Sequence, residues 1–213
     1  MKKIFVLISL VALCACCINQ SPIQLNGTEV REYQGEKLSS VNDFRENSIK
    51  GPQHVNITTY KLLVSGRVEE TKEYTYQQAL AFQSYTKVVQ LDCVEGWSAK
   101  ILWEGILLKD IIAQSKPTPD ANTIIFHAYD GYTTTMPLDY AIKNNILLAY
   151  RMNNVTMPPE RGYPFTVVAE NKWGYKWAKW VVEIELSNNS DYRGYWESNG
   201  YSKEGNLSGP FLG

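Results

Sequence analysis

The segment Val89-Gln90-Leu91-Asp92-Cys93-Val94-Glu95-Gly96 places the one cysteine that lies deep inside this 213-residue chain. Side chains at 89, 91 and 93 are apolar or weakly polar and alternate with polar ones at 90 and 92, and this period of two predicts a strand with one buried face. Glu95-Gly96 then ends the strand. Cys93 is therefore expected at the inward-facing end of a strand, where a loop begins, which is a good position for a functional side chain.

The four cysteines of the chain are unevenly distributed. Cys14, Cys16 and Cys17 lie near the N-terminus, and Cys93 is the fourth. Exported proteins in an oxidising setting usually pair their cysteines. A single internal cysteine is therefore a candidate free thiol, nucleophile or metal ligand, and the alternative is a small buried apolar side chain.

The first residues have the pattern of an export signal. Lys2 and Lys3 precede an apolar stretch at 4–13, which is too short to span a bilayer. The following Leu13-Cys14-Ala15-Cys16 is typical of a lipoprotein signal, in which the cysteine after a small residue is acylated and becomes the new N-terminus. Cys17 is the alternative acylated residue, and a cleaved signal with incidental cysteines is the alternative interpretation. We expect an extracytoplasmic protein, anchored through Cys16 to the outer face of the cell membrane.

Four segments make up the expected organisation. They are a lipoprotein signal peptide at 1–15, a polar tether and lead-in at 16–48, one domain at 49–203 and a C-terminal tail at 204–213. The length left after processing suits a single domain. The formal net charge is −1 and no basic patch is visible, so nucleic acid is not an expected partner.

Hydrophobic periodicity and turn signals predict a strand-rich α+β domain. Asp130-Gly131 is a strong two-residue hairpin signal between two strands. Proline opens one helix at position 137 and stops another at position 117. The expected strands are 60–64, 87–94, 123–129, 132–136, 165–169 and 180–186, and the expected helices are 76–82, 107–116 and 137–148.

Several common kinds of site are disfavoured by the sequence. It contains two histidines, His54 and His127, so a histidine-rich zinc or copper site is not expected. It has no glycine-rich phosphate loop and no Cys-x-x-Cys-His haem attachment. A cysteine-nucleophile hydrolase would need one of the two histidines beside Cys93, and no local motif indicates this pairing.

Four segments together resemble the sulfite oxidase family, whose members carry an oxidoreductase molybdopterin-binding domain and include the periplasmic methionine sulfoxide reductase catalytic subunit. They occur in the family's order between about Ile49 and Tyr201. The resembling segments are Leu91–Ser98 with Trp103–Leu108, Leu148–Asn153 with Met157–Pro164, Trp173–Trp180, and Gly194–Tyr201.

The resemblance implies a molybdenum centre held by the thiolate of Cys93, with a tungsten variant as the alternative. It further implies pterin contacts from Asn47, Arg161, Trp177, Ala178 and Lys179. A soft thiolate suits a high-valent metal whose other sulfur ligands come from a dithiolene. Lysine and consecutive backbone amides suit the pterin phosphate.

Some residues depart from the family's pattern. Thr166 stands where an arginine near the cofactor is usual, and Glu170 replaces a usual proline. Because neither threonine nor lysine reproduces a bidentate arginine contact, pterin contacts could be rearranged, affinity reduced or the substrate changed. The alternative interpretations are that Lys176 and Lys179 form a solvated face and that Arg161 is a loop charge.

The sequence supports two main functional hypotheses. The first is an oxidoreductase that transfers an oxygen atom to or from a small substrate such as sulfite or a sulfoxide, and exchanges electrons with a separate partner because no haem motif is present. The second is a cofactor-free surface binding lipoprotein that keeps the fold. Thr166, the 14 tyrosines and six tryptophans, and six glycosylation sequons favour this alternative.

Overall fold

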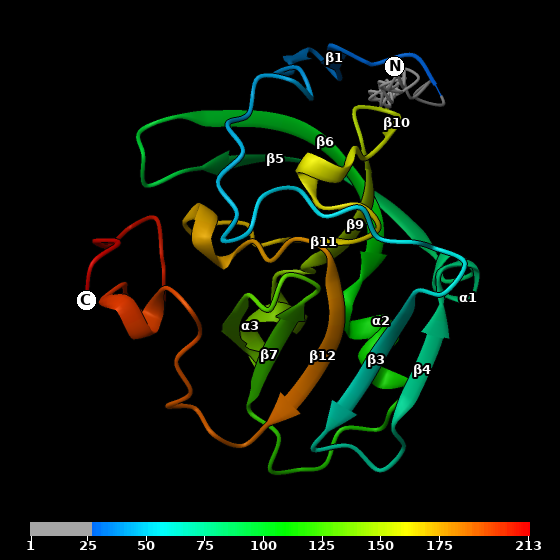
Figure 1. The fold of residues 1–213 in the computed structure, drawn as a ribbon, viewed down its shortest axis with the longest axis vertical. Helices are drawn as coiled ribbons and strands as arrows, with labels where there is room; N and C mark the ends of the chain where they lie inside the picture. Colours follow the sequence, from blue (N-terminus) through cyan, green and yellow to red (C-terminus); the bar gives the residue numbers. More distant parts are fainter. Residues whose placement is uncertain (1–26) are drawn as a thin grey trace, which may run out of the picture.

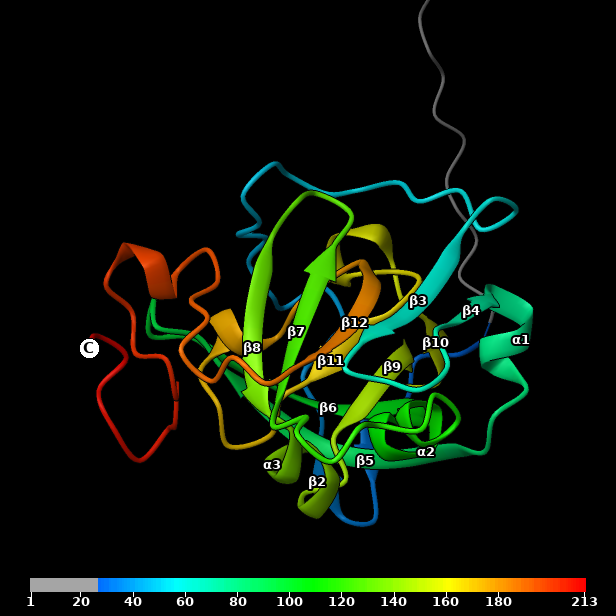
Figure 2. The ribbon, with the colours of Figure 1, turned by 90° about the horizontal axis from the view of Figure 1, so that it is seen from below.

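Two five-stranded sheets form the body of the protein in the computed structural model, which describes residues 27–213 (Figures 1 and 2). The first sheet runs in the order β10-β9-β6-β5, with β11 pairing beside β9, and all its pairs are antiparallel. Its strands are β5 (Ser84–Asp92), β6 (Ser98–Leu107), β9 (Leu147–Met152), β10 (Val155–Thr156) and β11 (Thr166–Val168).

The second sheet runs in the order β4-β3-β12-β7-β8. Its β3–β12 pair is parallel and the other pairs are antiparallel. Its strands are β3 (Lys61–Gly66), β4 (Lys72–Thr75), β7 (Thr123–Ala128), β8 (Thr133–Pro137) and β12 (Val181–Ser187). A small separate hairpin, β1 (Glu32–Tyr33) and β2 (Glu36–Lys37), precedes both sheets.

Short helices complete the mixed, strand-rich α+β architecture, which confirms the fold class predicted from the sequence. None of the helices in the part of the chain that the structure describes is long and apolar enough to cross a membrane. The α-helices are α1 (Tyr76–Leu80), α2 (Leu108–Ala113) and α3 (Leu138–Lys143), and the 3-10 helices are η1 (Pro159–Arg161), η2 (Gly174–Lys176) and η3 (Glu197–Asn199).

One hydrophobic core joins the two sheets. Ile101 and Trp103 of β6 belong to the same buried cluster as Phe126 of β7 and Ile184 of β12. The Trp103 side chain is 1% exposed, and its indole Nε1 donates to the carbonyl of Val89 on the neighbouring strand. This shared core fixes the strand ends, and the loops that leave those ends carry the candidate site.

The expected helix at 137–148 is wrong in its second half. Helix α3 ends at Lys143, and Asn145 takes a left-handed φ of 49°. Leu147 and Leu148 then pair with β6 as the start of β9. Their apolar run fits a strand buried on both sides as well as it fits a helix, and the pairing with β6 and β11 decides the outcome.

Two other predicted boundaries are also wrong. The helix expected to reach position 116 ends at Ala113, well before Pro117. Trp180, expected in the last strand, lies before β12 and has a φ of 54°. The strands that were not predicted are β1, β2, β4, β6, β9 and β10. Position 105 of β6 requires glycine because β9 lies close to it. A Cβ at Gly105 would lie 2.3 Å from the Leu148 carbonyl oxygen of β9.

The described part of the lead-in lies against the domain. The Val30 amide donates to the Asn153 carbonyl, and the side-chain amide of Asn153 donates to the Ser39 carbonyl and to Glu29. The limits of the segments at 16–48, 49–203 and 204–213 stay predictions. The predicted signal peptide and the acylated residue Cys16 fall outside the described residues.

Candidate functional site

Cys93 lies where two adjoining cavities meet. The larger has a volume of about 160 Å³ and the smaller about 60 Å³. Loops from both sheets and the lead-in converge there, since the β5–β6 turn, the segment before β3 and the segment between β11 and β12 all contribute. The residues that line both cavities are Asn47, Cys93, Gly174, Trp177 and Lys179.

A tight turn after β5 holds Cys93. Its amide donates to the Trp97 carbonyl, and the Gly96 amide donates back to the Cys93 carbonyl. Gly96 has a φ of 84°, which glycine adopts without strain. The Cys93 side chain is buried, with 5% exposed. The period-two pattern of the sequence correctly predicted the strand and the position of this thiol at its end.

The environment of Cys93 favours the neutral thiol in the absence of a bound cation. Burial raises its pKa, although the amides of Glu95 and Val94 and the Asn47 side chain oppose this effect. Asn47 Nδ2 lies 3.5 Å from Cys93 Sγ. Because a metal ion stabilises a thiolate directly, the same buried thiol suits metal coordination.

Lys179 is the cationic group shared by the two cavities. Its ammonium lies 2.6 Å from the Glu46 carboxylate and 4.5 Å from the centre of the Trp180 ring. Burial lowers the pKa of Lys179, although Glu46 opposes the shift. No backbone hydrogen bond within residues 27–213 uses the amides of Ala178 and Lys179. An ammonium beside two free amides is a suitable cradle for an anionic group.

Arg161 lines the smaller cavity, but its guanidinium also holds the lead-in. Its Nε donates to the Val41 carbonyl and its Nη2 to the Phe44 carbonyl. Thr166, the departure noted in the sequence, lines the same cavity and donates its hydroxyl to the Arg161 carbonyl. Gly162 between them has a φ of 106°, and a Cβ there would lie 1.8 Å from Thr166 Oγ1. Thr166 therefore fixes the turn that positions Arg161.

The remaining predicted pterin contacts, Trp177 and Ala178, differ in whether their side chains line the cavities. The Trp177 side chain lines both cavities, and its indole donates to the Lys172 carbonyl. Ala178 is fully buried, lines neither cavity and accepts a hydrogen bond from the Val167 amide at its carbonyl. Any contact from Ala178 to a ligand would thus use its backbone amide.

The sequence reasoning missed most of the outer wall of the larger cavity. Asp130 and Tyr132 were read only as parts of a hairpin, and Trp196 and Tyr201 only as a family-like tail. All four line the larger cavity, as does Tyr175. The hairpin signal at Asp130-Gly131 could not reveal this role, because the loop reaches the site only through the packing of the second sheet.

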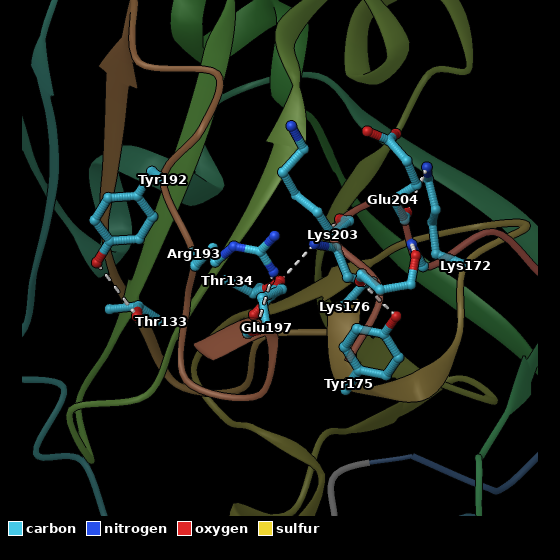
Figure 3. Close-up of polar contacts among 12 residues, drawn as sticks. Thr133, Thr134, Lys172, Tyr175, Lys176, Tyr192, Arg193, Glu197, Lys203 and Glu204 are labelled. Atoms are coloured by element: carbon cyan, nitrogen blue, oxygen red, sulfur yellow. Dashed lines mark hydrogen bonds and ion pairs between the residues drawn. The ribbon is translucent and has the colours of Figure 1, made fainter. Parts of the chain in front are cut away.

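A buried ion pair attaches the C-terminal segment to this wall (Figure 3). Lys176 Nζ lies 2.6 Å from Glu197 Oε1, with side-chain exposures of 1% and 0%. Thr134 donates to the same carboxylate oxygen, and Lys176 also donates to the Lys203 carbonyl. The alternative interpretation of Lys176 as part of a solvated face is therefore wrong. These contacts fix Glu197, which directly follows Trp196, and Lys203, which lies two residues after Tyr201.

Neither histidine lines the two cavities. His127 on β7 instead lies 2.8 Å from the Glu185 carboxylate on β12. A nucleophilic Cys93 would thus have no histidine in its own cavities to act as a base. Within residues 27–213, no cluster of three or more His, Cys, Asp or Glu side chains could hold a metal ion. The soft donor that the described residues offer to a metal at the cavities is the Cys93 sulfur.

The contribution of the Glu46–Lys179 ion pair to the stability of the fold should depend on pH. The Lys179 ammonium lowers the pKa of Glu46, against the effect of burial. A depressed carboxyl pKa stabilises the fold above the unfolded-state value and loses this effect as the pH falls through the folded-state value. In a double-mutant cycle of Glu46→Gln and Lys179→Met, we expect a coupling of about 1 kcal/mol near pH 7 that diminishes as the pH falls through the folded-state pKa of Glu46.

Urea unfolding of the four proteins at pH 7 and at a series of lower pH values measures this coupling. The pair Asp139–Lys143 on α3 is the matched control, since its side chains are 68% and 74% exposed. An exposed helical pair of this kind contributes at most about 0.5 kcal/mol. A Glu46–Lys179 coupling that persisted unchanged in acid would contradict the expectation.

Comparisons with known proteins identify relatives of this chain. The family model "Oxidoreductase molybdopterin binding domain" matches residues 49–196. The chain is 32% identical over 155 residues to the uncharacterized oxidoreductase YuiH of Bacillus subtilis, covering 72% of this chain and 78% of that protein. It is 26% identical over 178 residues to the protein-methionine-sulfoxide reductase catalytic subunit MsrP of Campylobacter jejuni, covering 76% and 60%.

Among solved structures, the fold is similar to that of the sulfane dehydrogenase SoxCD from Paracoccus pantotrophus. The TM-score is 0.67 at 16% identity, and the match covers 92% of this chain and 59% of the other. At this identity the likeness concerns the fold alone. The chain spans between 54% and 60% of the methionine-sulfoxide reductase subunits that it matches.

Proposed function

This chain belongs to the oxidoreductase molybdopterin-binding domain family, and from that membership we propose that it is an extracytoplasmic, lipid-anchored molybdenum enzyme. It transfers an oxygen atom to or from a small substrate such as a sulfoxide or sulfite. The observation that carries the proposal is the buried Cys93 thiol at the junction of two cavities, with Lys179 reaching both. The name of the Campylobacter relative favours a sulfoxide.

The residues at the cavities fit a molybdopterin group. Cys93 would hold the metal through its thiolate. Lys179 and the amides of Ala178 and Lys179 would hold the phosphate, and Asn47 and Trp177 would contact the remainder. Ser48 Oγ, buried and without a hydrogen-bond partner in the described chain, lines the larger cavity and offers a further polar contact. When bound, the cofactor supplies the redox chemistry.

The protein's own contribution is positioning and exclusion of water. Trp177 is 5% exposed, and its ring packs 5.6 Å from that of the fully buried Trp103. These two packed rings exclude water from one side of the Cys93 sulfur. A low-dielectric wall strengthens the attraction between Lys179 and a bound anion. Electrons would be exchanged with a separate partner, since the sequence carries no haem attachment motif.

Metal and pterin analysis of the purified chain tests the proposal. The protein is produced in a host that makes molybdopterin, and molybdenum, tungsten and released pterin are measured per polypeptide. We expect close to one metal atom and one pterin per chain, with molybdenum in excess over tungsten. A chain that folds but carries neither would overturn the proposal.

A cofactor-free binding lipoprotein is the second candidate, and the Glu46–Lys179 ion pair favours it. The carboxylate already satisfies the ammonium that would bind the pterin phosphate, and Thr166 supplies no positive charge where the family has one. This candidate predicts absence of released pterin and a Cys93 thiol that reacts with alkylating reagents in the purified protein. Released pterin would exclude it.

The proposed lipid anchor at Cys16 can be tested separately, by the location of cysteine variants in the cell. Cys16→Ser should release the protein into the medium or the soluble extracytoplasmic fraction, whereas Cys17→Ser should leave it with the membrane, since acylation replaces a marginal attachment by a multi-chain one. Mass spectrometry of the N-terminal peptide gives the added lipid directly. Lipid on Cys17, or an unmodified N-terminus in both variants, would contradict the assignment.

A further inference from the structure

The glycosylation sequons of the chain, Asn-x-Ser or Asn-x-Thr, differ in how firmly the fold holds them. Four of the six lie within the described residues, and their asparagines are all exposed to solvent. An enzyme that glycosylates a folded protein must reach the asparagine Nδ2 and draw the three residues into its own site, so the contacts of each sequon decide whether it can serve. The four asparagines are Asn56, Asn154, Asn188 and Asn206.

The sequons at Asn154 and Asn188 are held by other parts of the fold. The first continues into strand β10, where Val155 is 1% exposed and pairs with β9. In the second, Asn188 Nδ2 donates to the Asp120 carboxylate at 3.1 Å, and the Asn188 carbonyl accepts from the Asn122 side chain. Glycosylation of the folded protein at either asparagine would require breaking strand pairing or contacts with a distant loop.

The sequon at Asn206 is anchored by a buried lysine. Lys172, which is 2% exposed, donates its ammonium to Asn206 Oδ1 and to the Glu204 carbonyl. The Leu207 amide donates to the Asn171 carbonyl. Moving this asparagine out of its place would leave a buried ammonium with one acceptor fewer, which is costly. Asn206 is therefore a structural residue of the C-terminal segment.

The sequon at Asn56 makes only local hydrogen bonds. The Thr58 amide and hydroxyl donate to Asn56 Oδ1 at 3.0 and 2.8 Å, which forms an Asx turn. The Thr59 amide and hydroxyl donate to the Asn56 carbonyl. Within residues 27–213, no hydrogen bond uses Asn56 Nδ2 or joins positions 56–59 to another part of the chain. Ile57 packs against the core, while Asn56 and Thr58 are exposed.

A turn of this kind can open locally without disturbing a strand or a buried charge. We propose that Asn56 is an N-glycosylation site of the folded protein, preferred over the three other sequons in residues 27–213. Asn56 and Thr58 line neither cavity beside Cys93. A glycan on the segment that leads into β3 would thus leave the candidate site open.

The donor of the glycan would be a lipid-linked oligosaccharide phosphate. Asn56 Nδ2 forms the bond to the anomeric carbon of the first sugar, the bond from that carbon to the phosphate oxygen breaks, and the lipid phosphate leaves. One Nδ2 proton passes to the transferase. In the cell the reaction rests on the extracytoplasmic location that is part of the proposed function, because sequons are glycosylated in exported proteins. The capacity of the folded chain to accept the glycan requires neither that location nor the cofactor.

The test measures transfer to the purified full chain by an oligosaccharyltransferase supplied with a lipid-linked oligosaccharide. Synthetic peptides that span each of the four sequons are the unfolded reference, and peptide mass spectrometry quantifies the glycan at each asparagine. The rate at each site in the folded chain is divided by the rate in its peptide. We expect this ratio to be roughly tenfold or more higher at Asn56 than at the three other sites, because those sites must first break additional hydrogen bonds.

Variants at the sequon identify the modified residue. Asn56→Gln and Thr58→Ala should each abolish transfer at this site, since the first removes the acceptor nitrogen and the second the hydroxyl that the sequon requires. Urea unfolding checks that both variants fold. Asn188→Gln is the matched control, because it makes the same change at another exposed sequon, and it should leave transfer to Asn56 unchanged.

The outcomes separate this inference from the proposed function. Similar ratios at all four sites, or a higher ratio at another site, would overturn the preference for Asn56. No transfer to Asn56 in the folded chain, whether or not its peptide is modified, would overturn the acceptor site. Unmodified Asn56 in protein isolated from its native cells would overturn the modification itself. Molybdenum and pterin measured in the same preparation report on the oxidoreductase independently of the glycan.

Discussion

Under the proposed function, replacing Cys93 by serine is expected to reduce bound molybdenum from about one atom per chain to nearly none. The hydroxyl of serine has almost the shape of the thiol, so the turn held by the Cys93 amide and carbonyl persists. A hard, protonated hydroxyl does not replace a soft thiolate as a ligand to a sulfur-bound metal. With no cluster of other ligating side chains in the described part of the chain, nothing nearby substitutes for the sulfur.

Metal analysis and thermal unfolding of the same preparations measure the two parts of this expectation. The metal content should fall while the unfolding temperature of the cofactor-free protein changes little. Cys17→Ser is the control, because it removes a thiol from the same chain at a position far from Cys93 in the sequence. Close to one molybdenum atom per chain in both wild type and Cys93→Ser would show that the metal is held elsewhere, and the assignment of Cys93 would fail.

The position of Cys93 could be predicted from the sequence because local rules determine it. Alternation of side chains sets the face of β5, and Gly96 permits the turn that ends the strand. The hairpin at Asp130-Gly131 follows for the same reason. The order of the family-like segments added the expectation that Lys179 and Trp177 contact the pterin. That contact stays a prediction, and both residues line the cavities beside Cys93.

Features that depend on distant partners could not be predicted in this way. Lys179 meets Glu46, 133 positions earlier, and Lys176 meets Glu197, 21 positions later. Nothing in the spacing around either lysine distinguishes a buried pair from a solvated charge. Strand β9 shows the same limit, since Leu147 and Leu148 become strand residues through pairing with β6 and β11.

Thr166 is an instructive intermediate case. The sequence showed that an expected arginine is absent, but not what the threonine does. In the structure its hydroxyl closes the turn at Gly162 and holds the Arg161 carbonyl. The guanidinium of Arg161 is then directed to the lead-in carbonyls of Val41 and Phe44. The threonine at position 166, where the family usually has an arginine, thus occurs together with an Arg161 guanidinium that binds the lead-in.

Replacing Lys176 by methionine is expected to destabilise the protein by about 3–5 kcal/mol, because it leaves a buried carboxylate without its counter-charge. Glu197 is fully buried, and its second oxygen, Oε2, has no hydrogen-bond partner in the described chain. Within residues 27–213, only Thr134 and the Lys176 ammonium donate to Oε1. Methionine fills much of the same volume, so the loss reports the charge more than a cavity.

The double variant Lys176→Met, Glu197→Gln should recover most of this loss, because a neutral amide no longer needs a cation and can still accept from Thr134. Urea unfolding gives the free energy of each variant, and Lys143→Met on the exposed helix face is the control, with an expected change below about 0.5 kcal/mol. A Lys176→Met loss that Glu197→Gln deepened rather than restored would show that packing of the lysine stem, not charge compensation, fixes the segment bearing Trp196 and Tyr201.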